Sequence, residues 1–326
     1  MIVVLATGGT IACTTAPDGS LVPTIEAADL VAALHKHAPT TGETGLLAVD
    51  SARLDSSSLT LQQLDALVAQ VRALLADDSV EAIIITHGTD SMEDTAMALL
   101  LLLQPEKPVI LTGAQRSFDH AESDGIANLA DSLEFIISGS YSSGGVWIRF
   151  GGATIPAWGA QKIHTSNLLA FAADLDAIMP ELPPRITAPL ADTNVAVVAA
   201  WPGASRAVID AVAQLSDHAA IDGLVIEAMG SGNLSTEMGE ALCELAQAGL
   251  PVVITTRVSA GPVSFTYGGK GGGSSLGKAG AHAAGYLRSG QARMLLTIDI
   301  ATGQYPTLVN LADQQAKAAG RLRQRT

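Results

Sequence analysis

The chain has 326 residues, of which 48% are hydrophobic, and a formal net charge of −14. It is long enough to bury the core of one large α/β domain or of two unequal ones. The negative charge excludes broad neutralisation of nucleic-acid phosphates, and no uncharged apolar stretch reaches the ~18 residues that a membrane span needs. We therefore expect no nucleic-acid partner and no membrane partner.

The first half of the chain alternates buried strands with amphipathic helices. We expect strands at 2–5, 82–86, 108–112 and 145–148, and helices at 61–75, 92–103 and 126–137. The helices show apolar residues three and four apart, whereas the strands are short continuous apolar runs. This order of elements predicts an α/β fold, a doubly wound and mainly parallel sheet in a large N-terminal domain.

A proline-rich interruption at 179–189 separates a second series of elements. We predict an N-terminal domain at 1–180, a linker at 181–193 and a smaller C-terminal α/β domain at 194–326. In the C-terminal domain we expect strands at 195–199, 224–227, 252–255 and 294–298. The glycine-dense segment 268–275 is interpreted as a loop, because it lacks the strand-helix context of a nucleotide-binding fingerprint.

Polar residues follow several of these strands directly. They form the segments Thr7–Thr10, Thr86–Asp90, Thr112–Arg116 and Met229–Asn233. The carboxyl ends of the strands in a doubly wound parallel sheet share the edge where ligands bind. Residues far apart in the sequence are therefore expected to meet there.

Two threonine hydroxyls, at Thr10 and Thr89, make this edge a candidate nucleophile site. A threonine hydroxyl is a weak nucleophile and needs a base or a relay to one. Asp90 and Lys162 are the candidates, since an ammonium near an acid can tune a neighbouring hydroxyl. Considered alone, the glycine turn before Thr10 is equally consistent with a tight structural corner, and an isolated lysine is more often a solvated surface residue.

Neither a metal nor a disulfide is indicated. Cys13 and Cys243 have no C-x-x-C spacing, and the histidines and acids show no metal-ligand spacing. The start, MIVVLATGG, lacks the basic region of a secretory signal, so we expect a cytoplasmic protein.

These motifs resemble the bacterial-type L-asparaginases and the related glutaminase-asparaginases, nearly from end to end. The two signatures stand as Ala6–Ala12 (ATGGTIA) and Ile85–Glu93 (ITHGTDSME). Further matches are Thr112–Arg116, Ser123–Gly125 with Asn128, Lys162 with His164–Thr165, and Gly230–Asn233.

The resemblance implies an amidohydrolase that converts L-asparagine to L-aspartate and ammonia without a cofactor. It implies that Thr10 forms the acyl-enzyme and that Thr89 is a second hydroxyl, coupled to Lys162 and Asp90. Asp90 would also face the substrate's amino group. Backbone N–H groups around Gly9 and Gly88 are the expected oxyanion donors, because glycine lets the main chain approach closely.

The same resemblance suggests where the rest of the substrate binds. Ser56 falls where the family binds the α-carboxylate, and the backbone of Ala114 would contact the leaving amide. Asn233 would come from a neighbouring subunit, which implies a dimer at minimum and commonly a tetramer built as a dimer of dimers. Asp124 is interpreted as a loop cap or interface residue rather than a substrate contact.

The chain departs from the family pattern around the substrate. The lid segment 13–25 contains no tyrosine, segment 257–276 contains no acid, and Ser57 stands where the family has a glutamine. We hypothesise that Tyr267 of a neighbouring subunit replaces one of these contacts. An ordinary buried tyrosine is the alternative.

Three other functions stay open. A glutaminase-asparaginase needs room for only one more methylene in its substrate. A pocket discriminates between substrates that differ by one methylene by only ~1–3 kcal/mol. A non-catalytic homologue that binds aspartate or asparagine would not need an intact proton path. An asparaginase-like amidotransferase subunit is expected to carry an extra domain before the first strand.

Overall fold

The computed structural model describes residues 1–38, 45–141, 144–174, 176–217 and 220–323. The chain divides into two compact units, Met1–Ala173 and Asp174–Thr326. Each unit has its own parallel or mainly parallel sheet covered by helices, and the sheet of the first unit is the larger. The predicted fold class is therefore confirmed. Within the described ranges, no helix combines the length and apolarity needed to cross a bilayer.

The N-terminal unit is built on a six-stranded sheet in the order β4-β1-β5-β6-β7-β8. The first five strands are parallel, and β8 is antiparallel to β7. The strands are β1 (Ile2–Gly8), β4 (Leu46–Leu54), β5 (Ala82–Thr86), β6 (Pro108–Thr112), β7 (Gly145–Phe150) and β8 (Ala153–Pro156). The strands β1, β5 and β6 are buried along their whole length, because helices cover both faces of the sheet. Strands buried on both faces have largely continuous apolar sequences.

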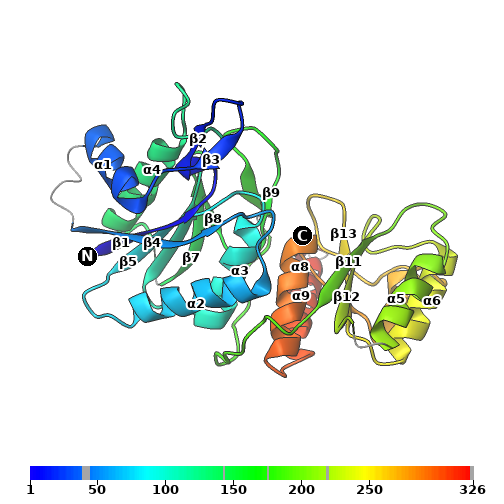
Figure 1. Cartoon of the computed structure of the whole chain (residues 1–326). Helices are drawn as coiled ribbons and strands as arrows, with labels where there is room; N and C mark the ends of the chain where they lie inside the picture. Colours follow the sequence, from blue (N-terminus) through cyan, green and yellow to red (C-terminus); the bar gives the residue numbers. More distant parts are fainter. Residues whose placement is uncertain (39–44, 142–143, 175, 218–219, 324–326) are drawn as a thin grey trace. The chain divides into compact units, whose positions relative to one another are not determined.

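In the described part of this unit, four helices form the outer layers (Figure 1). On one face α1 (Ala27–His37) packs beside α4 (Gly125–Ile137), and on the other α2 (Leu61–Leu75) packs beside α3 (Met92–Leu103). The connection β6–α4–β7 advances across the sheet in the same direction as β5–α3–β6 but over the opposite face. It therefore has the opposite hand, although parallel crossovers are right-handed in nearly all cases.

The strand order also locates the site. From β1 the chain passes over one face to β4, and from β5 it passes over the other face to β6. The loops after the neighbouring strands β1 and β5 therefore leave in opposite directions. Such a switch point opens a crevice at the carboxyl ends of the strands, where ligands bind in open α/β sheets.

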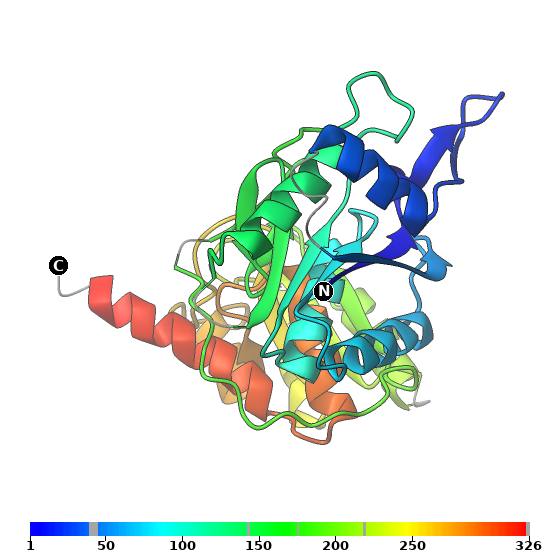
Figure 2. The same ribbon diagram turned by 90° about the vertical axis from the view of Figure 1, so that its left-hand side faces the viewer.

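A short turn and two small antiparallel pairs of strands border this crevice. The loop after β1 forms a 3-10 turn, η1 (Thr10–Ala12), followed by the antiparallel hairpin of β2 (Cys13–Thr15) and β3 (Leu21–Pro23). Figure 2 shows this hairpin projecting from the body of the N-terminal unit. A second antiparallel ribbon pairs β9 (Ala160–Lys162) with β10 (Phe171–Ala173).

The C-terminal unit has a parallel sheet in the order β11-β12-β13-β14. Its strands are β11 (Val195–Ala199), β12 (Gly223–Ala228), β13 (Val252–Thr256) and β14 (His282–Ala283). Its helices are α5 (Ala207–Asp217), α6 (Thr236–Gln247), α7 (Gly273–Lys278), α8 (Ser289–Ala301) and α9 (Thr307–Arg323). The core between the sheet and the pair α5 and α6 is made of aliphatic side chains such as Leu224, Ile226 and Leu242.

One predicted strand of this unit is wrong. Residues 294–298 lie inside α8, where Met294, Leu295 and Leu296 are buried on successive positions. A helix that is buried nearly all round shows the same short apolar run as a buried strand.

The predicted loop at 268–275 ends earlier than expected, because α7 begins at Gly273. The predicted linker, 181–193, contains neither helix nor strand.

Candidate active site

The loops after β1 and β5 touch backbone to backbone at the crevice. Gly9 has a φ of 80°, and a Cβ atom added to it would lie 2.5 Å from the nitrogen of Gly88. Only glycine combines this backbone conformation with so close an approach. Thr10 follows Gly9 and Thr89 follows Gly88. The contact between the two glycines therefore places these two threonines, both singled out from the sequence, on loops that touch.

His87 supports the second loop from within the core. Its Nδ1 lies 2.7 Å from the carbonyl oxygen of Gly88, and its Nε2 lies 3.1 Å from Oγ1 of Thr95. A carbonyl can only accept, so Nδ1 carries the proton and Nε2 accepts from the threonine hydroxyl. Burial lowers the pKa of His87 and keeps the ring neutral. The ring therefore orients the Gly88 peptide without placing a charge in the core.

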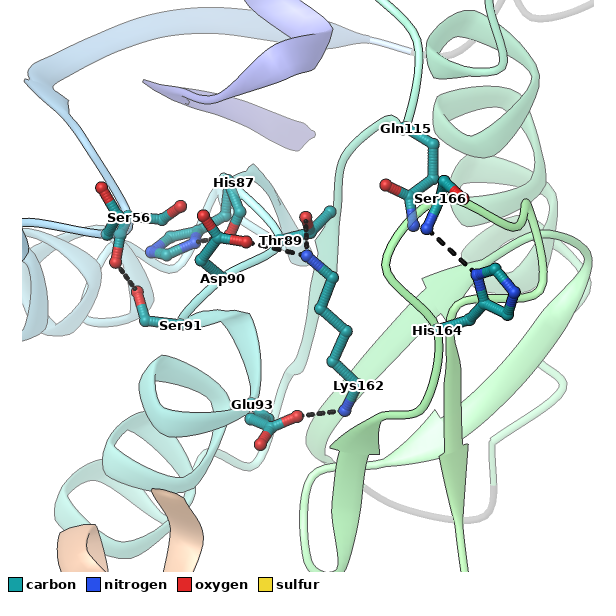
Figure 3. A network of polar contacts seen from close by, with 12 residues as sticks. Ser56, His87, Thr89, Asp90, Ser91, Glu93, Gln115, Lys162, His164 and Ser166 are labelled. Atoms are coloured by element: carbon teal, nitrogen blue, oxygen red, sulfur yellow. Dashed lines mark hydrogen bonds and ion pairs between the residues drawn. The ribbon is translucent and has the colours of Figure 1, made fainter. Parts of the chain in front are cut away.

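Lys162 joins the site from the ribbon β9–β10. Its Nζ donates to Oγ1 of Thr89 and to Oδ1 of Asp90, at 2.8 Å in each case (Figure 3). Thr89 is buried, whereas the Lys162 and Asp90 side chains are 21% and 59% exposed. An ion pair this open to water adds little stability. The ion pair matters for geometry instead, because it holds the Lys162 ammonium against the Thr89 hydroxyl.

The hydroxyl and the ion pair face one pocket of about 590 Å³. Seven residues predicted from the sequence line it: Gly9, Thr10, Ser56, Gly88, Thr89, Asp90 and Lys162. All of them come from the N-terminal unit. Thr10 and Ser56 are both partly exposed, as groups that meet a ligand must be.

Ser56 is set in place by the residues around it. Its carbonyl oxygen accepts a hydrogen bond of 2.6 Å from the Ser91 hydroxyl, at the start of α3 (Figure 3). A Cβ atom on Gly88 would overlap the Ser56 hydroxyl, so that hydroxyl lies directly against the Gly88 main chain. A polar donor thus stands beside the expected oxyanion donors.

Two further residues predicted to contact the substrate, Ser57 and Ala114, are not among those that line the pocket. The Ser57 hydroxyl donates at 2.8 Å to Oδ1 of Asp55, and this turn removes it from the pocket wall. The hydrogen bond lowers the pKa of Asp55. Ala114 is fully buried and packs in the hydrophobic core, so it does not line the pocket either.

Asp124 acts on the loop that follows β6, as a cap. Its carboxylate accepts hydrogen bonds from the main-chain N–H groups of Gln115, at 3.0 Å, and Arg116, at 2.9 Å. Asn128 donates at 3.0 Å to the carbonyl oxygen of Gly113. The loop that carries Gln115 into the pocket is therefore held from the start of α4.

Other pocket residues were missed by the sequence interpretation. They are Gly8, Cys13, Leu21, Pro23, Arg53, Leu54, Asp55, Gln115 and Thr165. Gln115 and Thr165 lie within motifs that carry the resemblance, so a signal for them existed. Arg53 had none, because nothing in its local pattern distinguishes it from a solvated strand residue.

Asn233 and Tyr267 belong to the C-terminal unit. Asn233 closes a tight turn after β12, where its main-chain N–H donates at 2.8 Å to the carbonyl oxygen of Met229. Tyr267 is 59% exposed, so it is not buried in the core of its own unit. Among the residues with described positions, no group of three or more His, Cys, Asp or Glu side chains is arranged to hold a metal ion.

Two family models match the chain. Residues 1–180 match "Asparaginase, N-terminal", and residues 194–310 match "Glutaminase/Asparaginase C-terminal domain".

Individual relatives carry related names. A "Probable L-asparaginase" of Deinococcus radiodurans is 33% identical over 254 residues, covering 73% of this chain and 75% of the relative. A "Glutaminase-asparaginase" of Acinetobacter glutaminasificans is 30% identical over 178 residues, covering 54% of each chain. The fold is similar to the crystal structure titled "Probable Cytoplasmic L-asparaginase from Campylobacter jejuni", with a TM-score of 0.81, 24% identity and coverage of 96% of this chain and 98% of the other.

Proposed function

Because the chain belongs to the asparaginase family, we propose that it hydrolyses L-asparagine to L-aspartate and ammonia through an acyl-enzyme on Thr10. One observation carries the proposal. The Lys162 ammonium lies 2.8 Å from the Thr89 hydroxyl and 2.8 Å from the Asp90 carboxylate, at the wall of the pocket that Thr10 also lines. A hydroxyl, an ammonium and a carboxylate in contact form the path that a weak hydroxyl nucleophile needs.

The reaction takes place in two steps. In the first, Oγ1 of Thr10 attacks the side-chain amide carbon, the C–N bond breaks, and the amide nitrogen leaves as ammonia after gaining a proton. In the second, water attacks the resulting ester, and L-aspartate leaves as the Thr10 hydroxyl is restored. The chain Thr89–Lys162–Asp90 supplies and accepts the protons in both steps. Main-chain N–H groups at Gly9 and Gly88 stabilise the oxyanion.

The amino-acid part of the substrate is held by polar groups of the same pocket. The exposed carboxylate of Asp90 binds the α-ammonium, and the Ser56 hydroxyl donates to the α-carboxylate. A charge-assisted contact of this kind is worth ~1.5–3 kcal/mol.

The test is ammonia release from L-asparagine and L-glutamine at matched concentrations, followed by mass spectrometry of the quenched enzyme. We expect faster release from L-asparagine and an ester of one aspartyl group on the peptide that contains Thr10. An ester on the peptide that contains Thr89, or no release from either amino acid, would contradict the proposal.

A glutaminase-asparaginase is the second candidate. The Acinetobacter glutaminasificans relative carries that name, and discrimination by one methylene is worth only ~1–3 kcal/mol. Equal rates of ammonia release from the two amino acids would favour it. A non-catalytic binding protein is disfavoured by the hydrogen-bonded arrangement of Thr89, Asp90 and Lys162.

The working enzyme is proposed to be a homo-oligomer, a tetramer built as a dimer of dimers, in which Asn233 and Tyr267 of a neighbouring copy complete each site. Mixed oligomers test this. Thr10→Ala and Asn233→Ala variants, each inactive alone, should regain activity after they are unfolded and refolded together, since some sites then receive both intact residues. Recovery no greater than the sum of the two variants would rule out the shared site. The cytoplasmic location stays a prediction.

A further inference from the structure

Glu93 contacts the opposite end of the lysine whose ammonium enters the pocket. It lies in the first turn of α3, and its carboxylate accepts a hydrogen bond from the main-chain N–H of Lys162 (Figure 3). Glu93 does not line the pocket. We infer that Glu93 is a positioning residue, which fixes the main chain of Lys162 and thereby sets where Nζ meets Thr89 and Asp90. The inference deepens the proposed function and rests on it.

The ribbon that carries Lys162 is weak by itself. The strands β9 and β10 have three residues each and pair with one another, outside the six-stranded sheet. A two-stranded ribbon by itself is marginally stable. The ribbon also packs against β8 through β10. The position of Nζ depends on the main chain of β9, from which the long side chain extends, so a contact at Lys162 itself matters most.

Glu93 lies on a helix that is firmly packed in the N-terminal unit. Met92 and Thr95, on either side of Glu93 in α3, are completely buried, as is most of the rest of the helix. Helix α3 packs against β7 of the large sheet and against β9. The hydrogen bond from Lys162 to Glu93 therefore ties the ribbon to a rigid element.

The start of α3 also positions other residues of the site. Ser91, two residues before Glu93, donates to the carbonyl oxygen of Ser56 at 2.6 Å. Thr89 and Asp90 lie at the end of the loop that leads into α3. The start of α3 thus holds both the segment of the expected α-carboxylate donor and the segment of the ammonium.

The charge state of Glu93 makes this contact sensitive to pH. Burial, assisted by the neighbouring Asp94, raises the pKa of Glu93 to about 7, whereas the hydrogen bond and charge of Lys162 act in the opposite direction. Below that pH the carboxyl is protonated, and above it the carboxylate is ionised and accepts the Lys162 N–H more strongly. Activity is therefore expected to rise as the pH passes about 7.

Two substitutions separate positioning from charge. Glu93→Gln keeps an oxygen acceptor, so kcat for L-asparagine should stay within about threefold, and the rise near neutral pH should disappear. Glu93→Leu removes the acceptor, and kcat should fall roughly 10- to 100-fold, the scale expected for a misplaced catalytic group. The KM should change less than threefold in both, because Glu93 does not line the pocket. Glu134→Gln and Glu134→Leu, on the exposed face of α4, are the matched controls.

A second measurement does not depend on turnover. Acetylation of Lys162 by acetic anhydride, followed by mass spectrometry, reports how firmly Nζ is held, with the exposed Lys36 as the internal reference. The rate at Lys162 relative to Lys36 should rise several-fold in Glu93→Leu and little in Glu93→Gln. Melting temperatures equal to that of the wild type would show that the variants are folded. If a variant melts at a lower temperature, its labelling would be compared with that of the wild type at a temperature where both proteins are native.

The two readouts distinguish the two proposals. A wild-type protein that releases no ammonia would overturn the proposed function, while the labelling ratio would still test the role of Glu93. If Glu93→Leu changed neither kcat nor the labelling of Lys162, the positioning role would be excluded and the proposed function would stand. Equal losses of kcat in the leucine and glutamine variants would also overturn it, since the glutamine retains the acceptor.

Discussion

Replacing Thr10 with alanine is expected to lower kcat for L-asparagine by roughly 10⁴- to 10⁶-fold, the range seen when a covalent nucleophile is removed. No ester can form without the hydroxyl, and the remaining pocket groups would only bind the amide. Thr10 is partly exposed, so the loss of its side chain should change the melting temperature little. Ammonia release and single-turnover kinetics measure the effect.

Thr10→Ser is the matched control, because it restores an alcohol at the same position. The alanine variant should still bind L-aspartate, since Ser56 and Asp90 are untouched, and calorimetric titration would show this. A kcat within a hundredfold of the wild type would remove Thr10 from the role of nucleophile. In that case Thr89→Ala becomes the decisive variant, because Thr89 is the hydroxyl that contacts Lys162.

Replacing Lys162 with methionine is expected to lower kcat roughly 10²- to 10⁴-fold, the usual contribution of a positioned acid-base group. Methionine keeps an unbranched stem of similar length but lacks the ammonium that bridges Thr89 and Asp90. The Asp90 side chain is 59% exposed, so water can solvate it after the change and little stability should be lost. The kcat should therefore fall while the melting temperature stays close to that of the wild type.

Lys107→Met is the control for the loss of a hydrogen-bonded lysine. Lys107 donates to the carbonyl oxygens of Leu75 and Asp77 and does not line the pocket. It should lower the melting temperature without lowering kcat. Lys162→Arg keeps a positive charge in a group that is not deprotonated in proteins. Full activity in the arginine variant would show that Lys162 acts by charge and not by carrying a proton.

Much of the secondary structure could be predicted because local pattern and tertiary packing agree. Helix α2 occupies 61–75 as predicted, with a Thr60 and Gln63 capping box at its start. The strand at 46–54 was not predicted, because its residues are mostly partly or fully exposed and include Asp50 and Arg53. This strand lies at the edge of the sheet, where it is less buried than a central strand, so it does not need a continuous run of apolar residues.

Local pattern alone predicted the candidate site as a set of loops at one edge of a sheet, and the coupling of Thr89 to Lys162 and Asp90 was expected from the family resemblance. Placing Thr10 and Thr89 after buried strands was enough to expect their loops to meet, because parallel strands share a carboxyl edge. The contact between Gly9 and Gly88 agrees with this. The substrate contacts expected of Ser57 and of the Ala114 main chain stay predictions, although the Ser57 hydroxyl is bonded to Asp55 and the Ala114 side chain packs in the core.

The amino-acid sequence by itself determined the class of fold, the glycine turns and the residue types that the chemistry needs, because these depend on contacts within a few residues. The family resemblance had suggested that Thr89 and Lys162 meet, but only the tertiary structure showed the contacts themselves. Lys162 contacts Thr89 across 73 positions of sequence, and Glu93 contacts the Lys162 main chain across 69. These contacts depend on the packing of α3 against β9, which no local pattern encodes.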